Sequence, residues 1–239
     1  MAFKTHLYGD RYMSNAKLNA AKSASKLIPK TGAIGLGSGS TVALFAEELG
    51  KRIAAKKVNV RVVPSSYQAY QLAIEFKIPL TNLDLDPELE LTVDGADEVD
   101  RNLNLTKGGG GALFQEKVVA SASKKLIIIV DEFKIVDQLA TRFEIPIEIL
   151  PFSLGVVLRK IQAMGIAPTV RQAQRKMGPV VTDNGNFILD LKFPEPIDDP
   201  AKVAMDLKMI PGVIETGLFI DMTDEVHVGK EDGVYILKK

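Results

Sequence analysis

The sequence predicts an α/β fold in which a Rossmann-like parallel sheet with helices on both faces is joined to a smaller α+β domain. Two observations support this expectation. Strand-type and helix-type segments alternate through the first half of the chain, which is typical of a parallel sheet covered by helices. After about Val136 the order becomes strand, helix, two strands, helix and strand, the βαββαβ order of a ferredoxin-like domain.

The first half of the chain supplies the strands and helices of the predicted parallel sheet. Leu126–Val130 is apolar throughout and is bounded by Lys125 and Asp131, as expected for a central strand buried on both faces. A short buried helix segment is the alternative, which the β-branched content disfavours. The alternating strand and helix segments are, in chain order, Ala33–Leu36, Thr41–Lys56, Val58–Val63, Ser66–Lys77, Leu89–Val93, Leu113–Ser123 and Lys125–Val130.

The second half predicts the smaller domain and a return to the first sheet. Thr182–Asn186 contains the Asn and Gly residues that tight turns require, so we expect a structural hairpin there. The tail, Glu225–Leu237, has strand signals and should rejoin the parallel sheet. We therefore expect one discontinuous catalytic domain, 1–137 with 218–239, and a smaller domain, 138–217. The segments of the smaller domain are Ile145–Leu150, Ser153–Met164, Thr169–Gln172, Asn186–Phe193, Pro200–Met209 and Val213–Phe219.

Composition excludes several kinds of chemistry. The 239 residues include no cysteine and two histidines, which excludes thiol nucleophiles, disulfides and Cys- or His-rich metal clusters. Thirty basic residues balance thirty acidic ones, so no overall field favours a nucleic acid or an anionic membrane. No apolar run approaches the roughly 18 residues of a membrane span, and Met1–Ser14 lacks a signal-peptide core. We therefore expect a cytoplasmic protein whose catalysis uses carboxylates, lysines, hydroxyls and backbone dipoles.

A glycine-rich loop, Gly35–Thr41, follows a predicted strand and opens a helix. In this arrangement free backbone N–H groups and the helix dipole can bind an anion, and Ser38, Ser40 and Thr41 add hydroxyl donors. A dinucleotide-binding loop is the alternative, but Ser40 replaces the third glycine and no acidic residue ends the next strand at Ser65. No Gly-Lys-Ser/Thr sequence closes a P-loop, and a tight turn without a ligand stays open.

Three further loops follow predicted strands and offer acid–base groups: Asp94–Asp97, Lys107–Gly111 and the segment that ends at Lys134. Asp94–Asp97 comes directly after a strand, and Lys107–Gly111 places four consecutive glycines before the helix that carries Glu116. Such a run costs conformational entropy, so it suits backbone that approaches a ligand closely. Taken singly, Asp94–Asp97 could be a solvated turn and Lys107–Gly111 a linker. Glu116 alone could be a helix-capping glutamate and Lys134 a surface lysine. Because the carboxyl ends of parallel strands share one edge, the four loops together predict one cleft.

With these residues identified, the sequence resembles the A-type ribose-5-phosphate isomerase family. Ser38 stands where many members have threonine and Gly111 where alanine is common, and neither change removes a chemical group that the reaction needs. The resemblance extends over roughly residues 15 to 239. The shared blocks, in order, are Gly37–Thr41, Asp94–Asp97, Lys107–Gly110, Glu116-Lys117, Lys134, Val181–Asn186 and Ile210–Val213.

The resemblance implies the reversible conversion of D-ribose 5-phosphate to D-ribulose 5-phosphate through an enediolate, in the non-oxidative pentose phosphate pathway. By position, Glu116 would be the general base, with Asp94, Asp97 and Lys107 as further catalytic residues. No cofactor and no metal are implied. Carried over in the same way, the substrate-binding residues would be Ser38, Gly39, Ser40, Thr41, Asp94, Gly95, Ala96, Asp97, Lys107, Gly108, Gly109, Gly110 and Lys134.

The implied partner is a small-molecule sugar phosphate, with no nucleic acid and no membrane. The smaller domain would support a homodimer, or a tetramer of paired dimers. Two rival functions stay open: a non-catalytic sugar-phosphate sensor domain, and an enzyme of another class such as an acyl-CoA transferase or a nucleotide-cofactor oxidoreductase. The sensor would need a DNA-binding segment, for which the stretch before Lys17 is too short. Which glycine-rich loop would hold the phosphate is open.

Overall fold

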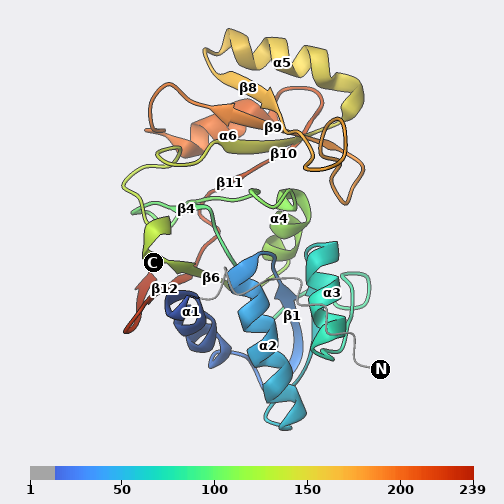
Figure 1. The fold of residues 1–239 in the computed structure, drawn as a ribbon, viewed down its shortest axis with the longest axis vertical. Coiled ribbons are helices and arrows are strands. Elements are labelled where there is room, and N and C mark those ends of the chain that lie inside the picture. Colours follow the sequence, from blue (N-terminus) through green and yellow to red (C-terminus); the bar gives the residue numbers. More distant parts are fainter. Residues whose placement is uncertain (1–13) are drawn as a thin grey trace. The chain divides into compact units, whose positions relative to one another are not determined.

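The computed structural model describes residues 14–239, and the polar segment before Ser14 lies outside this range. The chain divides into two compact units, and Figure 1 labels all six α-helices of the described range and several of the strands. The sequence predicted two domains, 1–137 with 218–239 and 138–217, and these bounds remain a prediction. The first unit comprises Met1–Gly95, Val118–Phe133 and Asp224–Lys239, and the second comprises Ala96–Lys117 and Lys134–Thr223.

The first unit contains a six-stranded sheet in which five neighbouring strands are parallel and the last, β13, is antiparallel to β12. From β1 the chain proceeds to β2 and later returns to β3 on the other side of β1, so the strand order reverses between β1 and β3. This is a doubly wound, Rossmann-like arrangement, as predicted. The strands in spatial order are β13 (Gly233–Lys238), β12 (Glu225–Lys230), β6 (Leu126–Asp131), β3 (Thr92–Asp94), β1 (Thr31–Leu36) and β2 (Asn59–Pro64).

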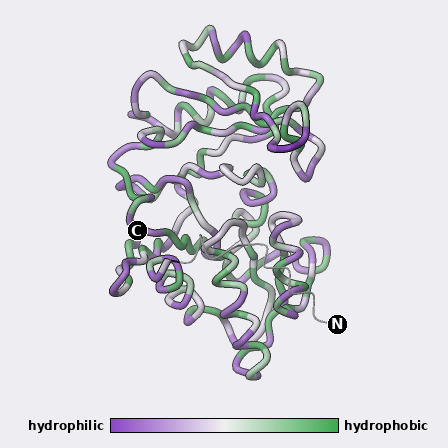
Figure 2. Tube along the Cα trace, viewed as in Figure 1, coloured by the Kyte–Doolittle hydropathy of each residue, from purple (hydrophilic) through white to green (hydrophobic). Residues whose placement is uncertain are grey.

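The apolar run of β6 is a central strand of this sheet, as expected. Its first five residues are buried, and Figure 2 shows it as a continuous green stretch beside the C-terminal label. β6 pairs in parallel with β3 on one side and with β12 on the other. The tail therefore rejoins the first sheet, which confirms the expectation for Glu225–Leu237.

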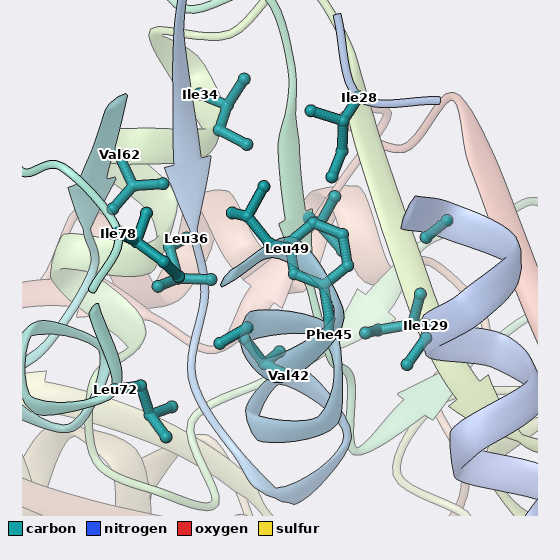
Figure 3. Packing of buried hydrophobic residues seen from close by; sticks show 14 of the residues in the cluster. Ile28, Ile34, Leu36, Val42, Phe45, Leu49, Val62, Leu72, Ile78 and Ile129 are labelled. Carbon is teal, nitrogen blue, oxygen red and sulfur yellow. The ribbon is translucent and has the colours of Figure 1, made fainter. Parts of the chain in front are cut away.

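Helices pack on both faces of the sheet. One face is covered by α1 (Asn15–Ser25), α2 (Ser40–Ala54) and α3 (Tyr67–Glu75), because the sheet and the helices share one buried cluster. On the other face, Val119 of α4 (Leu113–Ser121) packs with Ala33, Val63 and Leu89. Figure 3 shows the larger cluster and labels Ile28, Ile34, Leu36, Val42, Phe45, Leu49, Val62, Leu72, Ile78 and Ile129.

The second unit contains the predicted ferredoxin-like βαββαβ order. The four strands of this motif form one sheet in the order β10-β7-β9-β8, and each is antiparallel to its neighbours. Alternate isoleucines of β7 join Val157 and Ile161 of α5 and Leu207 of α6 in one buried cluster, so one sheet face carries both helices. The elements are β7 (Ile145–Ile149), α5 (Leu154–Ala163), β8 (Ala167–Val170), β9 (Phe187–Lys192), α6 (Pro200–Lys208) and β10 (Val213–Thr216).

A third, short sheet in the second unit was not expected from the sequence. It consists of β4 (Glu98–Val99), β5 (Leu105–Thr106) and β11 (Leu218–Phe219), in the order β11-β5-β4. The sequence predicted one continuous strand over Val213–Phe219, and this is wrong, because the chain leaves β10 at Gly217 and pairs with β5 instead. A Cβ on Gly217 would lie 2.2 Å from the Lys107 carbonyl oxygen, so a glycine is needed at this crossing.

Two further structural findings concern the described residues. The segment Thr182–Asn186 is a tight turn, in which Thr182 N–H donates to the Asn186 carbonyl at 2.9 Å and Gly185 has a positive φ of 79°.

Within residues 14–239, no helix is long and apolar enough to cross a bilayer.

Candidate active site

The first group of candidate residues lies in the first unit, where the strand order reverses between β1 and β3. β1 ends at Leu36, and α2 begins at Ser40 after an N-cap glycine, Gly39, whose φ is 105°. Glycine provides no side chain to cap the helix, so the first N–H groups of α2 need other acceptors. The fold therefore puts an anion-attracting helix terminus at the position where doubly wound sheets bind ligands.

Asp94, the last residue of β3, holds the loop that leads into α2. Its Oδ1 atom accepts hydrogen bonds from Ser38 N–H at 3.0 Å and from Gly95 N–H at 2.7 Å, and the residue is 1% exposed. A Cβ on Gly37 would lie 2.1 Å from the same oxygen, which explains the glycine at that position. The sequence suggested a contact with sugar hydroxyls for Asp94, and the structure adds a second role, the positioning of the glycine-rich loop.

Residues after β2 complete this first group and were not predicted from the sequence. Ser38 Oγ lies 3.1 Å from Ser65 Oγ and 2.7 Å from Ser66 Oγ, and Gly39 N–H donates to Gln68 Oε1 at 3.0 Å. These residues follow β2, which is parallel to β1, so their proximity could have been inferred from the shared strand edge.

A lysine from α1 reaches the same loop. Lys17 Nζ donates to Ser40 Oγ at 3.1 Å, which places an ammonium group beside the first residue of α2. Thr41 is 9% exposed and begins the buried side of the helix. The first group thus combines backbone donors, hydroxyls and a cation, the groups that bind phosphate.

The second group lies in the second unit and contains the candidate base. Glu116 is in the first turn of α4, and its Oε2 atom lies 3.3 Å from Lys107 Nζ. The two side chains are 6% and 3% exposed, so this ion pair is buried. Lys107 is held by its backbone N–H, which donates to the Gly217 carbonyl at 2.8 Å, and its ammonium lies 5.5 Å from the centre of the Phe219 ring.

The glycine loop after Lys107 is tied to Asp97, which precedes β4. Gly109 N–H donates to Asp97 Oδ2 at 2.8 Å, and a Cβ on Gly109 would lie 2.8 Å from the other carboxylate oxygen. Gly108 has a φ of 107° and would place a Cβ 2.7 Å from Leu113, so it too must be a glycine. Gly110 is exposed, with nothing within 4 Å of an added Cβ, and thus leaves open backbone beside the loop.

Lys117, which follows the candidate base, braces the segment that holds Lys107. Its ammonium donates to the carbonyls of Thr216 at 2.6 Å and Leu218 at 2.9 Å, and pairs with Glu215 at 2.9 Å. It also lies 4.7 Å from the centre of the Phe219 ring. Burial lowers the pKa of Lys117, although the negative charge of Glu215 opposes the shift. Lys117 therefore stabilises the segment 215–218, which also holds Lys107.

Three other residues of the predicted site, Gly95, Ala96 and Lys134, make few contacts with the remaining candidates. Gly95 contributes its N–H to Asp94, and Ala96 is half-buried in the turn that follows. Lys134 ends a short 3-10 helix, and its ammonium lies 4.3 Å from the centre of the Phe143 ring. Among the residues that the structure describes, no hydrogen bond or ion pair joins Lys134 to another candidate.

A metal-dependent mechanism was not expected. From Ser14 onward, no three His, Cys, Asp or Glu side chains gather in a way that could hold a metal ion. The two groups contain three carboxylates, buried and exposed ammonium groups, hydroxyls and backbone N–H donors.

Comparison with known proteins adds to this geometry. The model of the family described as ribose 5-phosphate isomerase A (phosphoriboisomerase A) matches residues 61–233. This chain belongs to the ribose 5-phosphate isomerase A family. The ribose-5-phosphate isomerase A of Methanococcus aeolicus is 47% identical over 227 residues, which are 95% of this chain and 96% of the relative. That of Pyrococcus horikoshii is 45% identical over 221 residues, 92% and 96% of the two chains.

Solved structures of this family share the fold. Ribose 5-phosphate isomerase A from Methanocaldococcus jannaschii has a TM-score of 0.90 and 43% identity, covering 94% of this chain and 99% of its own. A D-ribose-5-phosphate isomerase in complex with phospho-erythronic acid has a TM-score of 0.91 and 44% identity, covering 94% and 98%. The fold class and the family expected from the sequence are therefore confirmed. The roles of individual residues stay predictions.

Proposed function

We propose that the chain catalyses the reversible conversion of D-ribose 5-phosphate to D-ribulose 5-phosphate, with Glu116 as the base that moves the proton. One observation carries the proposal: a carboxylate in the first turn of α4 is buried 3.3 Å from the ammonium of Lys107, beside a glycine loop, in a member of the isomerase A family. The complex of a related isomerase with phospho-erythronic acid supports a phosphorylated sugar as the ligand.

The reaction requires one proton to move from C2 to C1 and another to move from O2 to O1. Glu116 removes the proton from C2 of the open-chain aldose, the C2–H electron pair forms the enediolate, and Glu116 then delivers a proton to C1, while a proton moves from O2 to O1 to give the ketose. One carboxylate can perform both transfers if it reaches both carbons. No oxidant or reductant is consumed, because the oxidation of C2 is balanced by the reduction of C1.

The enediolate carries negative charge on oxygen and needs donors aimed at that oxygen. Lys107 Nζ is suited to this role, because it is held next to the carboxylate that creates the charge. Exposed backbone at Gly110 offers a further N–H donor, whereas the Gly109 N–H donates to Asp97. Preorganised donors of this kind usually supply much of the rate enhancement, since they need not reorient during the reaction.

We assign the phosphate to the first group of residues. The 15-residue helix α2 has an N-cap without a side-chain hydrogen bond, and Ser40 beside it accepts from Lys17. A helix terminus, hydroxyls and an ammonium together favour a dianion. The carboxylates of Asp94 and Asp97 would repel it, so they are better suited to sugar hydroxyls and to the proton shift between O1 and O2. Gly95, Ala96, Gly108 and Lys134 complete the proposed substrate site by position.

Assembly, location and metabolic context are part of the same proposal. We expect a cytoplasmic homodimer, or a tetramer, in the non-oxidative pentose phosphate pathway. Self-association is supported by exposed apolar side chains in the second unit, where Phe152 is 96%, Met205 69% and Met209 76% exposed. Light scattering on the purified protein would measure the number of chains.

The direct test is an assay with purified protein and D-ribose 5-phosphate, without added metal or nicotinamide cofactor, in which D-ribulose 5-phosphate is followed by NMR. We expect rapid turnover, and no turnover of D-ribose, which lacks the phosphate. Absence of turnover with ribose 5-phosphate would contradict the proposal. Tight binding without turnover would favour the sensor function, and exchange of CoA thioesters would favour the transferase.

A further inference from the structure

An arginine outside the residues considered so far contacts the glycine loop. Arg171 follows β8, and its Nη1 atom donates to the carbonyl oxygens of Gly108 at 2.8 Å and Gly109 at 3.1 Å. These two carbonyls belong to the peptides that lead from Lys107 toward Gly110. One cation thus binds two consecutive carbonyls of a loop that has little conformational preference of its own.

The arginine is itself fixed by a carboxylate on the neighbouring strand. Arg171 Nε donates to Asp190 Oδ2 at 2.8 Å, and Nη2 binds Oδ1, so the pair is bidentate. The backbone supports this geometry, because Arg171 N–H donates to the Ile188 carbonyl and Asp190 pairs with Thr169 of β8. The side chains of Arg171 and Asp190 are 18% and 17% exposed, so solvent competes only partly with the fork.

The contact determines which way the loop N–H groups point. The peptides are trans, so the Gly108 carbonyl and the Gly109 N–H point in opposite directions, the first to Arg171 and the second to Asp97. By the same geometry, the Gly109 carbonyl faces Arg171 while the Gly110 N–H points away from it. Within residues 14–239 that N–H has no hydrogen-bond acceptor, so it is available to a ligand.

The positive charge also affects the strength of these donors. A cation bound to a carbonyl oxygen polarises the peptide, and the N–H of that peptide becomes a stronger donor. Arg171 therefore acts on the loop in two ways, by fixing the orientation of two peptide planes and by polarising their N–H groups. At the Gly110 N–H, both effects favour an oxyanion on the side opposite Arg171.

We propose that Arg171, held by Asp190, is a positioning residue for the isomerisation, which orients the Gly110 N–H of the glycine loop toward the oxygen that becomes negative in the enediolate. This inference rests on the proposed isomerase function. Arg171 does not touch the substrate. Its effect belongs to the transition state, because the charge that the Gly110 N–H stabilises is absent from the bound aldose.

The test compares three variants with the wild-type chain in steady-state turnover of D-ribose 5-phosphate. Arg171→Met removes the guanidinium, Arg171→Lys keeps a charge without the fork, and Asp190→Asn removes the charge that holds the fork. We expect kcat to fall about tenfold or more for Arg171→Met with KM changed less than about threefold, and to fall less for the other two. Arg159→Met is the matched control, because Arg159 lies exposed on α5, and its kcat should be unchanged.

Thermal unfolding of each variant separates positioning from simple support of the fold. A lower melting temperature with unchanged kcat in Arg171→Met would overturn the inference. If that variant does not fold, unchanged kcat in both Arg171→Lys and Asp190→Asn would overturn it equally. An inactive wild-type protein would contradict the proposed function itself, whereas an active wild type with fully active variants would contradict only the role of Arg171.

Discussion

The ammonium of Lys107 lies 3.3 Å from Oε2 of Glu116 in surroundings that leave these side chains 3% and 6% exposed. Two buried charges are stable together mainly because each compensates the other, since removing either leaves an unpaired charge away from water. The pair also puts a cation next to the carboxylate that would abstract the proton. The ion pair thus connects the stability of the second unit to the chemistry proposed for it.

Removal of one partner should therefore be costly. We predict that Lys107→Met lowers the free energy of unfolding by about 3–5 kcal/mol, because the buried Glu116 carboxylate loses the ammonium that lies 3.3 Å away. The double variant Lys107→Met/Glu116→Gln should recover part of this loss. Urea denaturation measures both, with Lys160→Met on the exposed part of α5 as the control. A double variant that is no more stable than Lys107→Met would contradict the coupling.

The close approach of Gly37 to Asp94 gives a second prediction. In Gly37→Ala the new methyl group would lie 2.1 Å from Asp94 Oδ1, so the carboxylate or the loop must shift. We expect a loss of about 1–3 kcal/mol in stability and a weaker affinity for inorganic phosphate, measured by competition with ribose 5-phosphate. Gly155→Ala is the matched control, because its Cβ meets nothing within 4 Å and a helical alanine should add up to about 1 kcal/mol. Unchanged phosphate affinity in Gly37→Ala would show that the phosphate binds elsewhere.

His227 on β12 predicts a pH dependence of stability. The residue is 1% exposed, its Nδ1 lies 2.8 Å from Ser23 Oγ, and burial lowers its pKa despite the nearby carboxylate of Glu225. The unfolded chain therefore binds a proton at a higher pH than the folded chain does. As the pH falls through about 6.5, the unfolded state gains protons first, and the free energy of unfolding decreases.

The measurement compares the wild type with His227→Gln in urea at pH 7.5 and 5.5. The wild type should lose more stability between these two values than the variant, because glutamine cannot bind the proton. An equal loss in both proteins would assign the pH dependence to other groups.

Local sequence patterns predicted most of the fold. The apolar run in β6 and the alternation of strands and helices reflect burial within single elements, so they can be read from neighbouring residues. The break at Gly217 could not, because it depends on a change of pairing partner from β7 to β5. An apolar strand pattern is the same on both sides of such a break.

The candidate site divides in the same way. Loops that follow strands, such as Asp94–Asp97 and Lys107–Gly110, carry their signal in residue type and order. Ser65, Ser66 and Gln68 were missed because their proximity to Ser38 depends on the parallel pairing of β1 with β2. Arg171 was missed for a stronger reason, since the glycines that it binds are 62 and 63 residues away in the chain.

The central claim is that Glu116 moves the proton, and proton exchange tests it most directly. In D₂O, NMR follows the replacement of the C2 proton of ribose 5-phosphate by deuterium, for the wild type, Glu116→Gln and the carboxylate-retaining Glu116→Asp. Circular dichroism confirms that each variant is folded. We predict that Glu116→Gln slows exchange about 10²–10⁴-fold while Glu116→Asp keeps a measurable part of the rate. A folded Glu116→Gln protein that exchanges the proton within about tenfold of the wild-type rate would show that another group is the base.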